Sequence, residues 1–203
     1  MPGLVIFDVD NTVVRYDRAR RVAVMAERLG RTEDEVTDAV FHSGIEDAAD
    51  AGRIGADEYL QALGRRLGTP VPRDVWVEAR AAAVTPDPQM VTLLAAVARQ
   101  VPTVLLTNNG SLLREEFARI APAVAALGLP LYAGGDLRLA KPDPAVYRAV
   151  AALHGVEPGD TLFVDDSDAY VAGARDAGVR AHVFTGHDAA VAFLRAEGVA
   201  LDL

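Results

Sequence analysis

The chain of 203 residues contains no cysteine. It therefore forms neither disulfide bonds nor thiolate metal sites, and it has no cysteine nucleophile. It also lacks any run of about 18 consecutive apolar residues, the length that a membrane-spanning helix needs. No basic segment precedes the short apolar run near the first residue, so a secretion signal is not indicated. We expect a soluble cytoplasmic protein that does not bind a membrane.

Basic residues are also scarce. Lysine and arginine number 20 against 29 acidic residues, which gives a net charge of −9 at pH 7. Because the charges are interspersed and form no basic stripe, nucleic-acid binding is disfavoured. The chain has a single lysine, Lys141. The phosphate-binding patterns GxxxxGKS/T and GxGxxG are both missing, so neither a kinase nor a dinucleotide-binding protein is indicated.

The apolar content is sufficient for a sizeable core, since 51% of the residues are hydrophobic and 24% are charged. Short apolar runs without alternation predict strands that are buried on both faces. These runs cover residues 4–7, 101–106, 129–132, 161–164 and 179–184. Helix-like segments cover residues 111–120, 144–153, 169–177 and 188–196. Strands alternating with helices predict an α/β fold, with a Rossmann-like three-layer core in which helices cover both sides of a parallel sheet.

The interval from about residue 16 to residue 86 departs from this alternation. It contains no convincing strand, and its apolar residues recur at helical spacing, which predicts four or five short helices. Thr32 and Glu35 form a capping box at the start of one of them. We predict an α/β core of residues 1–15 and 87–203, with a small all-helical cap of residues 16–86 that sits over it as a lid.

Polar residues follow three of the predicted strands at the point where each strand ends. They are Asp8 and Asp10, Thr107 and Asn108, and Asp165 and Asp166. Ligands of open parallel sheets bind beyond the carboxyl ends of the strands, so we expect one shared site. The four carboxylates carry a formal charge of −4, which requires protonation or a cation. Since only oxygen ligands are available, the sequence predicts Mg²⁺ at this site.

Lys141 is the candidate for a fixed positive charge in the same site. It precedes Pro142, Asp143 and Pro144, where Asp143 can cap a helix whose first turn accepts Pro144. A compact ammonium suits a position that must touch phosphate and carboxylate together, where the broad guanidinium of arginine would not fit. With a hydroxyl donor from Thr107, this arrangement predicts phosphoryl transfer to a carboxylate.

Several segments match one known family, in the family's order along the chain. They are LVIFDVDNT, VLLTNNG, KPDPAVY and LFVDDSDAYVAGARDAG, with AGRIGADEYLQAL in the insert. Each segment is weak alone, and together they are highly specific. Over nearly its entire length the sequence resembles the haloacid dehalogenase-like hydrolase superfamily, in its branch of phosphatases with a helical cap inserted after the first strand.

The resemblance implies roles for the two aspartates of the first motif. Asp8 would be the nucleophile that forms an aspartyl-phosphate, and also a metal ligand. Asp10 would protonate the leaving oxygen and then activate water, with its backbone carbonyl on Mg²⁺. The dehalogenase branch lacks the second aspartate, so Asp10 implies phosphate esters instead of halides. The implied activity is that of a Mg²⁺-dependent phosphatase for a small phosphorylated metabolite.

The resemblance also implies roles for the later motifs. Thr107, with Asn108 beside it, would bind the phosphate oxygens. Lys141 would steady the nucleophile and the phosphoryl charge. Asp166 would ligate the metal, with Asp165 next to it.

One position departs from the family pattern. Family members of this kind usually carry an acidic or asparagine side chain four residues after the metal-binding aspartate, where this chain has Tyr170. Asp168 either substitutes for that group or caps the following helix. The departure bears on metal affinity and on the orientation of Lys141.

Other interpretations use the same residue types. A sugar-phosphate mutase would transfer the phosphoryl group from the aspartyl-phosphate to another acceptor instead of water. A signalling receiver module also combines acidic residues with a threonine and a lysine. An inert scaffold would keep the fold without any activity. Taken singly, the aspartates also suit strand ends and helix caps, and the lysine suits an exposed surface. In the insert and its hinge, either ordinary exposure or contact with the organic part of a substrate would explain Arg15, Tyr16, His42, Ser43 and Arg53.

Overall fold

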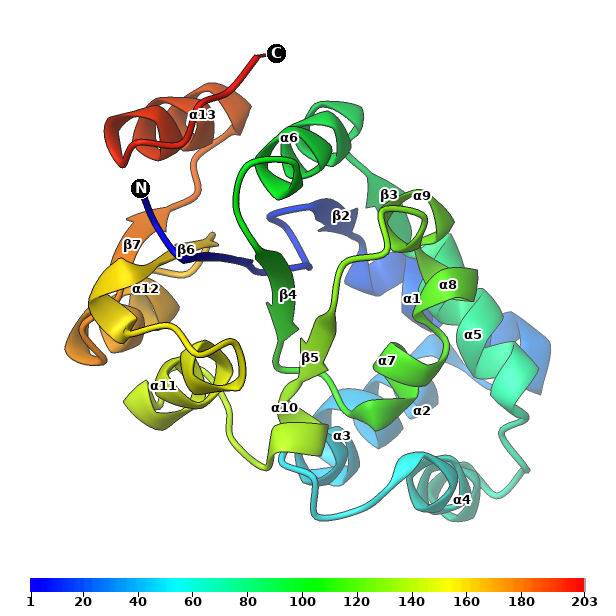
Figure 1. The fold of residues 1–203 in the computed structure, drawn as a ribbon. Coiled ribbons are helices and arrows are strands. Elements are labelled where there is room, and N and C mark those ends of the chain that lie inside the picture. The colour runs from blue at the N-terminus through cyan, green and yellow to red at the C-terminus, as the bar shows by residue number, and fades with distance from the viewer. Residues whose placement is uncertain (203) are drawn as a thin grey trace.

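A computed structural model describes residues 1–202 of the chain (Figure 1). Its central element is a parallel sheet of five strands in the order β5–β4–β1–β6–β7. The strands are β1 (Leu4–Phe7), β4 (Thr103–Thr107), β5 (Leu131–Ala133), β6 (Thr161–Asp165) and β7 (Arg180–Val183). The first strand of the chain is therefore the middle strand of the sheet, between β4 and β6.

Nine helices surround this sheet in the described part of the chain. They are α6 (Pro88–Ala98), α7 (Ser111–Glu115), α8 (Phe117–Ile120), α9 (Pro122–Ala125), α10 (Gly134–Leu137), α11 (Pro144–Leu153), the 3-10 helix η2 (Pro158–Asp160), α12 (Asp168–Asp176) and α13 (His187–Ala196). Asp143 caps α11 by accepting a hydrogen bond from the Ala145 amide (2.8 Å), as the sequence predicts. Within residues 1–202, no helix combines the length and the apolar character that crossing a membrane requires.

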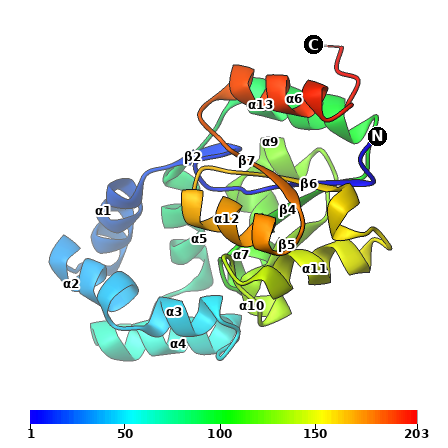
Figure 2. The same ribbon diagram turned by 90° about the vertical axis from the view of Figure 1, so that its left-hand side faces the viewer.

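The sheet lies between two layers of helices (Figure 2). Along β1, Val5 and Phe7 belong to the apolar cluster that includes residues of α6 and α13. Leu4 and Ile6 belong to the opposite cluster, formed with α11 and α12. Because both faces are covered, all four residues of β1 are apolar and buried. The predicted three-layer α/β core is confirmed.

Two strands begin two residues later than their apolar runs predict. β4 begins at Thr103 and β5 at Leu131, each two residues after the start of the run. Each strand begins directly after a proline, Pro102 or Pro130. Because a proline nitrogen carries no hydrogen for the ladder, it delays the strand although the apolar pattern continues.

The helical segment of residues 18–82 forms the cap. Its helices are α1 (Arg18–Leu29), α2 (Glu33–Thr37), the π-helix η1 (Asp38–His42), α3 (Ile45–Asp50), α4 (Ala56–Leu67) and α5 (Arg73–Ala82). The predicted capping box of Thr32 and Glu35 is present at the start of α2. Every element between residues 18 and 82 is a helix, as predicted, while the division of the cap from the core after residues 15 and 86 stays a prediction.

Two short strands connect the cap to the core. β2 (Val14–Tyr16) and β3 (Val84–Pro86) pair antiparallel at the two crossings between the parts. The expectation of no strand between residues 16 and 86 is therefore wrong at both ends of that interval. Strands of three residues are too short for an apolar pattern to reveal, and their partners are far apart in the sequence.

The cap rests on the core through apolar contacts. The apolar cluster of the cap also includes three side chains of the core helices α7 and α8, which are Leu112, Leu113 and Ile120. The single helix predicted over residues 111–120 is broken at Glu116, where the backbone leaves the helical conformation (φ −104°, ψ 8°). After the break, Phe117 packs in the apolar cluster that includes residues of α6 and α13, while Leu112, Leu113 and Ile120 pack against the cap.

A buried polar network links four cap helices. Arg21 of α1 donates two hydrogen bonds to the carboxylate of Glu46 in α3 (2.7 and 2.9 Å). Tyr59 of α4 donates to the same carboxylate (2.6 Å) and accepts from Trp76 of α5 (3.3 Å). Burial by itself raises the pKa of Glu46, but the Arg21 guanidinium outweighs burial and holds that pKa below its ordinary value.

We predict that Glu46→Gln destabilises the protein by about 3–5 kcal/mol at neutral pH, because Arg21 then lies buried without a counter-charge. The pKa of Glu46 is lower in the folded than in the unfolded protein. The stabilisation is therefore complete above the ordinary glutamate pKa of about 4.3, and it is lost as the pH falls through the folded-state pKa. Urea unfolding of both proteins at a series of pH values from neutral to acidic measures this difference in the free energy of unfolding. The difference should be largest at neutral pH and should vanish in acid.

The matched control for this prediction is Glu78→Gln. Glu78 pairs with Arg28 in the same cap, but both side chains are about half exposed. Solvent screens such a pair, so the control variant should lose only a small part of the stability that Glu46→Gln loses. Equal losses in the two variants, or a Glu46→Gln loss that persists unchanged in acid, would contradict the interpretation of the network.

A second prediction concerns the close approach of α12 to the loop that carries Lys141. A Cβ atom on Gly173 would lie 1.9 Å from the carbonyl oxygen of Pro142, a backbone atom with no room to move aside. Gly173→Ala should lower the free energy of unfolding by about 1–3 kcal/mol through overpacking. Urea unfolding checks this against Gly159→Ala, where a Cβ meets no atom of residues 1–202 within 4 Å. Indistinguishable stabilities of the two variants would be the contrary result.

Candidate active site

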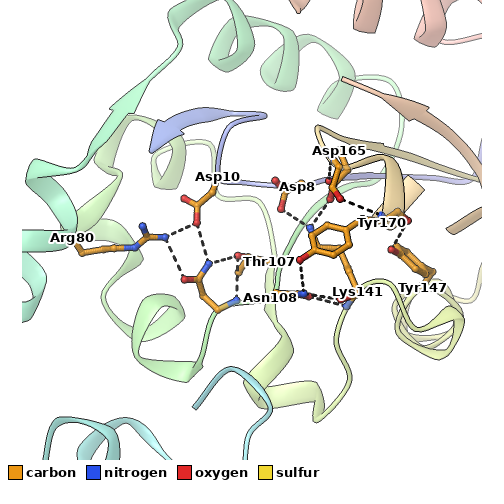
Figure 3. Close-up of polar contacts among 11 residues, drawn as sticks. Asp8, Asp10, Arg80, Thr107, Asn108, Lys141, Tyr147, Asp165 and Tyr170 are labelled. Atoms are coloured by element: carbon orange, nitrogen blue, oxygen red, sulfur yellow. Dashed lines mark hydrogen bonds and ion pairs between the residues drawn. The ribbon is translucent and has the colours of Figure 1, made fainter. Parts of the chain in front are cut away.

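The carboxyl ends of three adjacent strands bring the predicted polar residues together (Figure 3). Asp8 follows β1, Thr107 ends β4, and Asp165 ends β6. Because β4 and β6 are the two neighbours of β1, these side chains meet at one edge of the sheet. Their order along the chain gives no hint of this, since about 60 to 100 residues separate them.

Lys141 is the centre of the site. Its ammonium donates to Asp8 Oδ1 (2.5 Å) and to Asp165 Oδ2 (2.6 Å), and all three side chains are buried. Burial by itself lowers the pKa of Lys141, but the two carboxylates raise it above its ordinary value. The residue is therefore a permanent positive charge inside the fold, held between two acids.

Three carboxylates gather beside this ammonium. Oxygen atoms of Asp8, Asp165 and Asp166 lie within 4.8 Å of one another. Both oxygens of Asp165 already accept hydrogen bonds, one from Lys141 and one from the Ser167 amide (2.8 Å). Asp8 uses one oxygen for the ammonium, and Asp166 is exposed at the rim.

The electrostatics of this cluster favour a cation. Burial raises the pKa of Asp8 to about 7 in spite of Lys141. Burial and the nearby Asp165 also raise the pKa of Asp166. Both shifts report carboxylates whose charge is only partly compensated. An all-oxygen donor set of this kind fits Mg²⁺, for which Asp8 and Asp166 offer the available oxygens.

Asn108 has a position that its sequence motif did not reveal. Its side-chain oxygen accepts from the Lys141 backbone amide (2.8 Å), and its side-chain nitrogen donates to the Lys141 carbonyl (2.8 Å). The two bonds fasten the Lys141 backbone to the end of β4. Both polar atoms of the Asn108 side chain thus bind the Lys141 backbone. The predicted contact of Asn108 with phosphate stays a prediction.

Tyr170, the departure from the family pattern, covers Lys141. The ammonium lies 4.8 Å from the centre of the Tyr170 ring, at cation–π distance. The Tyr170 hydroxyl accepts a weak hydrogen bond from Asn108 (3.3 Å), and its carbonyl accepts from Tyr147 (2.6 Å). An aromatic face thus occupies the place expected for an acid. Asp168 has neither predicted role: Ser167 caps α12 by accepting from the Tyr170 amide, and the cluster of carboxylates contains Asp8, Asp165 and Asp166 but not Asp168.

Asp10 lies apart from the three clustered carboxylates. Its Oδ2 accepts from Arg80 of the cap (2.5 Å) and from the Asn109 side chain (3.1 Å). The same Asn109 nitrogen donates to the Thr107 hydroxyl (2.6 Å) and so joins the two predicted catalytic side chains. Sequence reasoning missed Arg80 because the helical pattern of α5 does not distinguish it from other arginines. Asn109 stood within the recognised TNN segment but was assigned no role.

A cavity of about 210 Å³ opens among these residues. It is lined by Asp8, Asp10, Asn11, Thr107, Asn108, Asn109, Lys141, Asp166 and Tyr170. A larger hollow of about 470 Å³ lies along α4 of the cap and contains none of the site residues. The cavity of about 210 Å³ is the one that the candidate site residues line. Its size suits a phosphate group with a small substituent.

Known proteins of one family resemble this chain in sequence. A family model described as haloacid dehalogenase-like hydrolase matches residues 2–178. The chain belongs to this family. One relative, phosphoglycolate phosphatase 1 of Pseudomonas aeruginosa, is 30% identical over 206 residues, covering 91% of this chain and 70% of the relative.

Solved structures of haloacid dehalogenase-like enzymes share the fold. An enzyme of Bacteroides thetaiotaomicron, in complex with magnesium and inorganic phosphate, matches with a TM-score of 0.75 at 19% identity over 90% of this chain and 94% of that one. A family hydrolase of Porphyromonas gingivalis matches with a TM-score of 0.80 at 18% identity over 96% of this chain and 98% of that one. This haloacid dehalogenase-like chain therefore has the α/β core and the inserted cap of its family.

We predict that Asn108→Ala releases Lys141 from its buried position. The loss of both side-chain bonds leaves the amide and carbonyl of Lys141 unpaired, which should cost about 1–3 kcal/mol of stability. Because Lys141 is the only lysine, its accessibility can be followed directly with an amine-acylating reagent and peptide mass spectrometry. Acylation of Lys141 should be slow in the unmodified sequence and clearly faster in the variant.

The N-terminal amine provides an internal control for this labelling. Met1 is 84% exposed, so its acylation should be equally fast in both proteins. An unchanged acylation rate at Lys141 in the variant would show that Asn108 does not hold the lysine in place.

Proposed function

We propose that this chain is a Mg²⁺-dependent phosphatase that hydrolyses a small phosphate monoester through an aspartyl-phosphate on Asp8. The observation that carries the proposal is the pair of ion contacts from Lys141 to Asp8 and Asp165 beside the acidic cluster. A buried carboxylate can approach an anionic phosphate only where positive charge is fixed next to it. Membership of a hydrolase family and a phosphatase relative support the same reaction.

In the proposed first step, the free oxygen of the Asp8 carboxylate attacks phosphorus. The ester P–O bond breaks, and its electron pair remains on the leaving oxygen, which takes a proton from Asp10. Lys141 keeps its contact with the other Asp8 oxygen and so orients the nucleophile. We assign to the Thr107 hydroxyl and the Lys141 ammonium the role of holding the phosphoryl oxygens, and their position in the lining of the cavity supports this assignment.

In the proposed second step, water hydrolyses the aspartyl-phosphate. Asp10, now a carboxylate, accepts a proton from the water molecule as it attacks phosphorus, and the phosphate leaves Asp8. When bound, Mg²⁺ would neutralise phosphate charge during both steps. Asp8 and Asp166 would hold it with side-chain oxygens, and Asp10 with its backbone carbonyl, while Asp165 would anchor Lys141.

The cap favours a small metabolite as the substrate. It rests directly on the core at α7 and α8, and its Arg80 side chain reaches Asp10 in the lining of the cavity of about 210 Å³. A cap that closes over the site would exclude water from phosphoryl transfer, and a polymer would obstruct that closure. Because the bacterial relative is a phosphoglycolate phosphatase, 2-phosphoglycolate belongs at the head of the substrate panel.

The test is a screen of phosphate monoesters, including 2-phosphoglycolate, sugar phosphates, nucleoside monophosphates and p-nitrophenyl phosphate. We expect phosphate release with Mg²⁺ and its loss in excess chelator. Asp8→Asn should abolish turnover without loss of folded structure by circular dichroism, because the amide is a poor nucleophile of similar shape.

Asp168→Asn serves as the control for this test. Asp168 is an exposed aspartate near the same strand end, and Ser167 performs the capping of α12. The variant should retain activity and its Mg²⁺ requirement. No phosphate release from any ester, or equal release in excess chelator, would refute the proposed function. Transfer of the phosphoryl group to a second sugar phosphate instead of water would indicate a mutase.

A further inference from the structure

The two carboxylate oxygens of Asp10 have unlike surroundings. Oδ2 accepts hydrogen bonds from Arg80 Nη2 (2.5 Å) and Asn109 Nδ2 (3.1 Å). Oδ1 is buried and has no hydrogen-bond partner among residues 1–202, although Asp10 lines the site cavity. One oxygen is thus committed to protein donors. The other is left to carry a proton or to meet a substrate atom.

Arg80 reaches this site from the cap. It lies on α5, 70 residues from Asp10 in the sequence, and is 1% exposed. Its guanidinium stacks on the ring of Tyr16 at 4.0 Å, and Tyr16 belongs to the connecting strand β2. Nη2 also donates to the Asn109 side-chain oxygen (3.3 Å). The guanidinium is therefore held between strand β2, which connects cap and core, and Asp10, the proposed general acid of the core.

Stability alone does not account for an arginine at this position. Nε and Nη1 of Arg80 are buried without hydrogen-bond partners within residues 1–202. Unpaired buried donors each lose their hydration, which costs free energy, and an apolar side chain of similar length would avoid that loss. Arg80 retains these unpaired donors although it is the cap side chain that forms an ion pair with Asp10. A loss of stability beside the proposed catalytic carboxyl group indicates that Arg80 has a functional role.

We propose that Arg80 is a positioning residue through which the cap orients the Asp10 carboxyl group for proton transfer. The inference rests on the proposed phosphatase function. Because Arg80 and Asn109 occupy Oδ2, the proton of the acid form is carried by Oδ1. In the transfer the Oδ1–H bond breaks and the proton binds the ester oxygen, while the P–O bond breaks and leaves its electron pair on that oxygen.

The geometry requires an arginine in particular. One guanidinium nitrogen donates to both Asp10 and Asn109, and the guanidinium carbon lies 4.0 Å from the centre of the Tyr16 ring. A lysine ammonium is a point charge without a plane, so it would keep the charge and lose the stacking. Arg80→Lys should therefore restore only part of the function of Arg80.

The experiment uses four aryl phosphates of similar shape with leaving groups of increasing basicity. They are p-nitrophenyl, p-chlorophenyl, phenyl and p-methoxyphenyl phosphate. A weakly basic leaving group needs little protonation, so kcat/KM for p-nitrophenyl phosphate should depend least on the acid. In Arg80→Met, kcat/KM for phenyl phosphate should fall about tenfold more than kcat/KM for p-nitrophenyl phosphate. This factor is smaller than the full contribution of a general acid, because Asp10 itself is still present. Arg80→Lys should lie between, and Asp10→Asn should show the steepest dependence.

Arg73→Gln is the matched control. Arg73 lies on the same helix and also joins cap to core, through Glu115 (2.8 Å) and Glu116 (3.0 Å), but it does not contact Asp10. Its loss should change kcat/KM for all four esters by one common factor. Asn109→Ala removes the second donor to Oδ2 and should steepen the dependence even if Arg80→Met fails to fold.

The outcomes separate the two proposals. A common factor for all four esters in both Arg80→Met and Asn109→Ala, or no loss in either, would overturn the positioning role while the phosphatase function stands. If the unmodified protein releases phosphate from none of the esters and from none of the metabolite panel, the proposed function fails and the role of Arg80 falls with it.

Discussion

The ion contacts of Lys141 with Asp8 and Asp165 are the interaction on which the rest of the site depends. Two carboxylates buried side by side repel each other and lose their hydration, so they stay charged together only with a cation between them. The surrounding structure serves this cation. Asn108 fastens its backbone, Tyr170 covers it with an aromatic face, and the close approach at Gly173 fits α12 to its loop.

The cap and the core are joined by contacts of three kinds. Two strands of three residues pair where the chain crosses between the parts. Apolar side chains of α7 and α8 complete the core of the cap. The third kind is polar: Arg73 pairs with Glu115 and Glu116, and Arg80 reaches the site itself at Asp10. The cap also holds its own helices together through Arg21 and Glu46, and in our proposal the Arg80–Asp10 pair links this unit to the site.

The sequence-based interpretation succeeded where the signal is local or follows from membership of the family. Apolar runs indicated all five strands of the sheet, and the polar residues that follow three of them lie close together in the structure, as expected. The strands that begin after Pro102 and Pro130 were predicted two residues too early. Their apolar runs include the proline, whose nitrogen has no hydrogen to donate to the sheet. The two short strands beside the cap were missed because a three-residue strand depends on its partner and has no periodic pattern of its own.

Composition and motif order were enough to determine the α/β core, the helical cap, the absence of thiol chemistry and the residue types of the candidate site. These properties depend on the side chains present and on short-range periodicity, which a linear sequence carries. The tertiary structure decided the partners: that Asn108 binds Lys141, that Tyr170 covers it, and that Arg80 reaches across 70 residues to Asp10. Pair contacts of this kind arise only when the sheet order and the seat of the cap bring distant segments to within hydrogen-bond distance, and no local pattern records that distance.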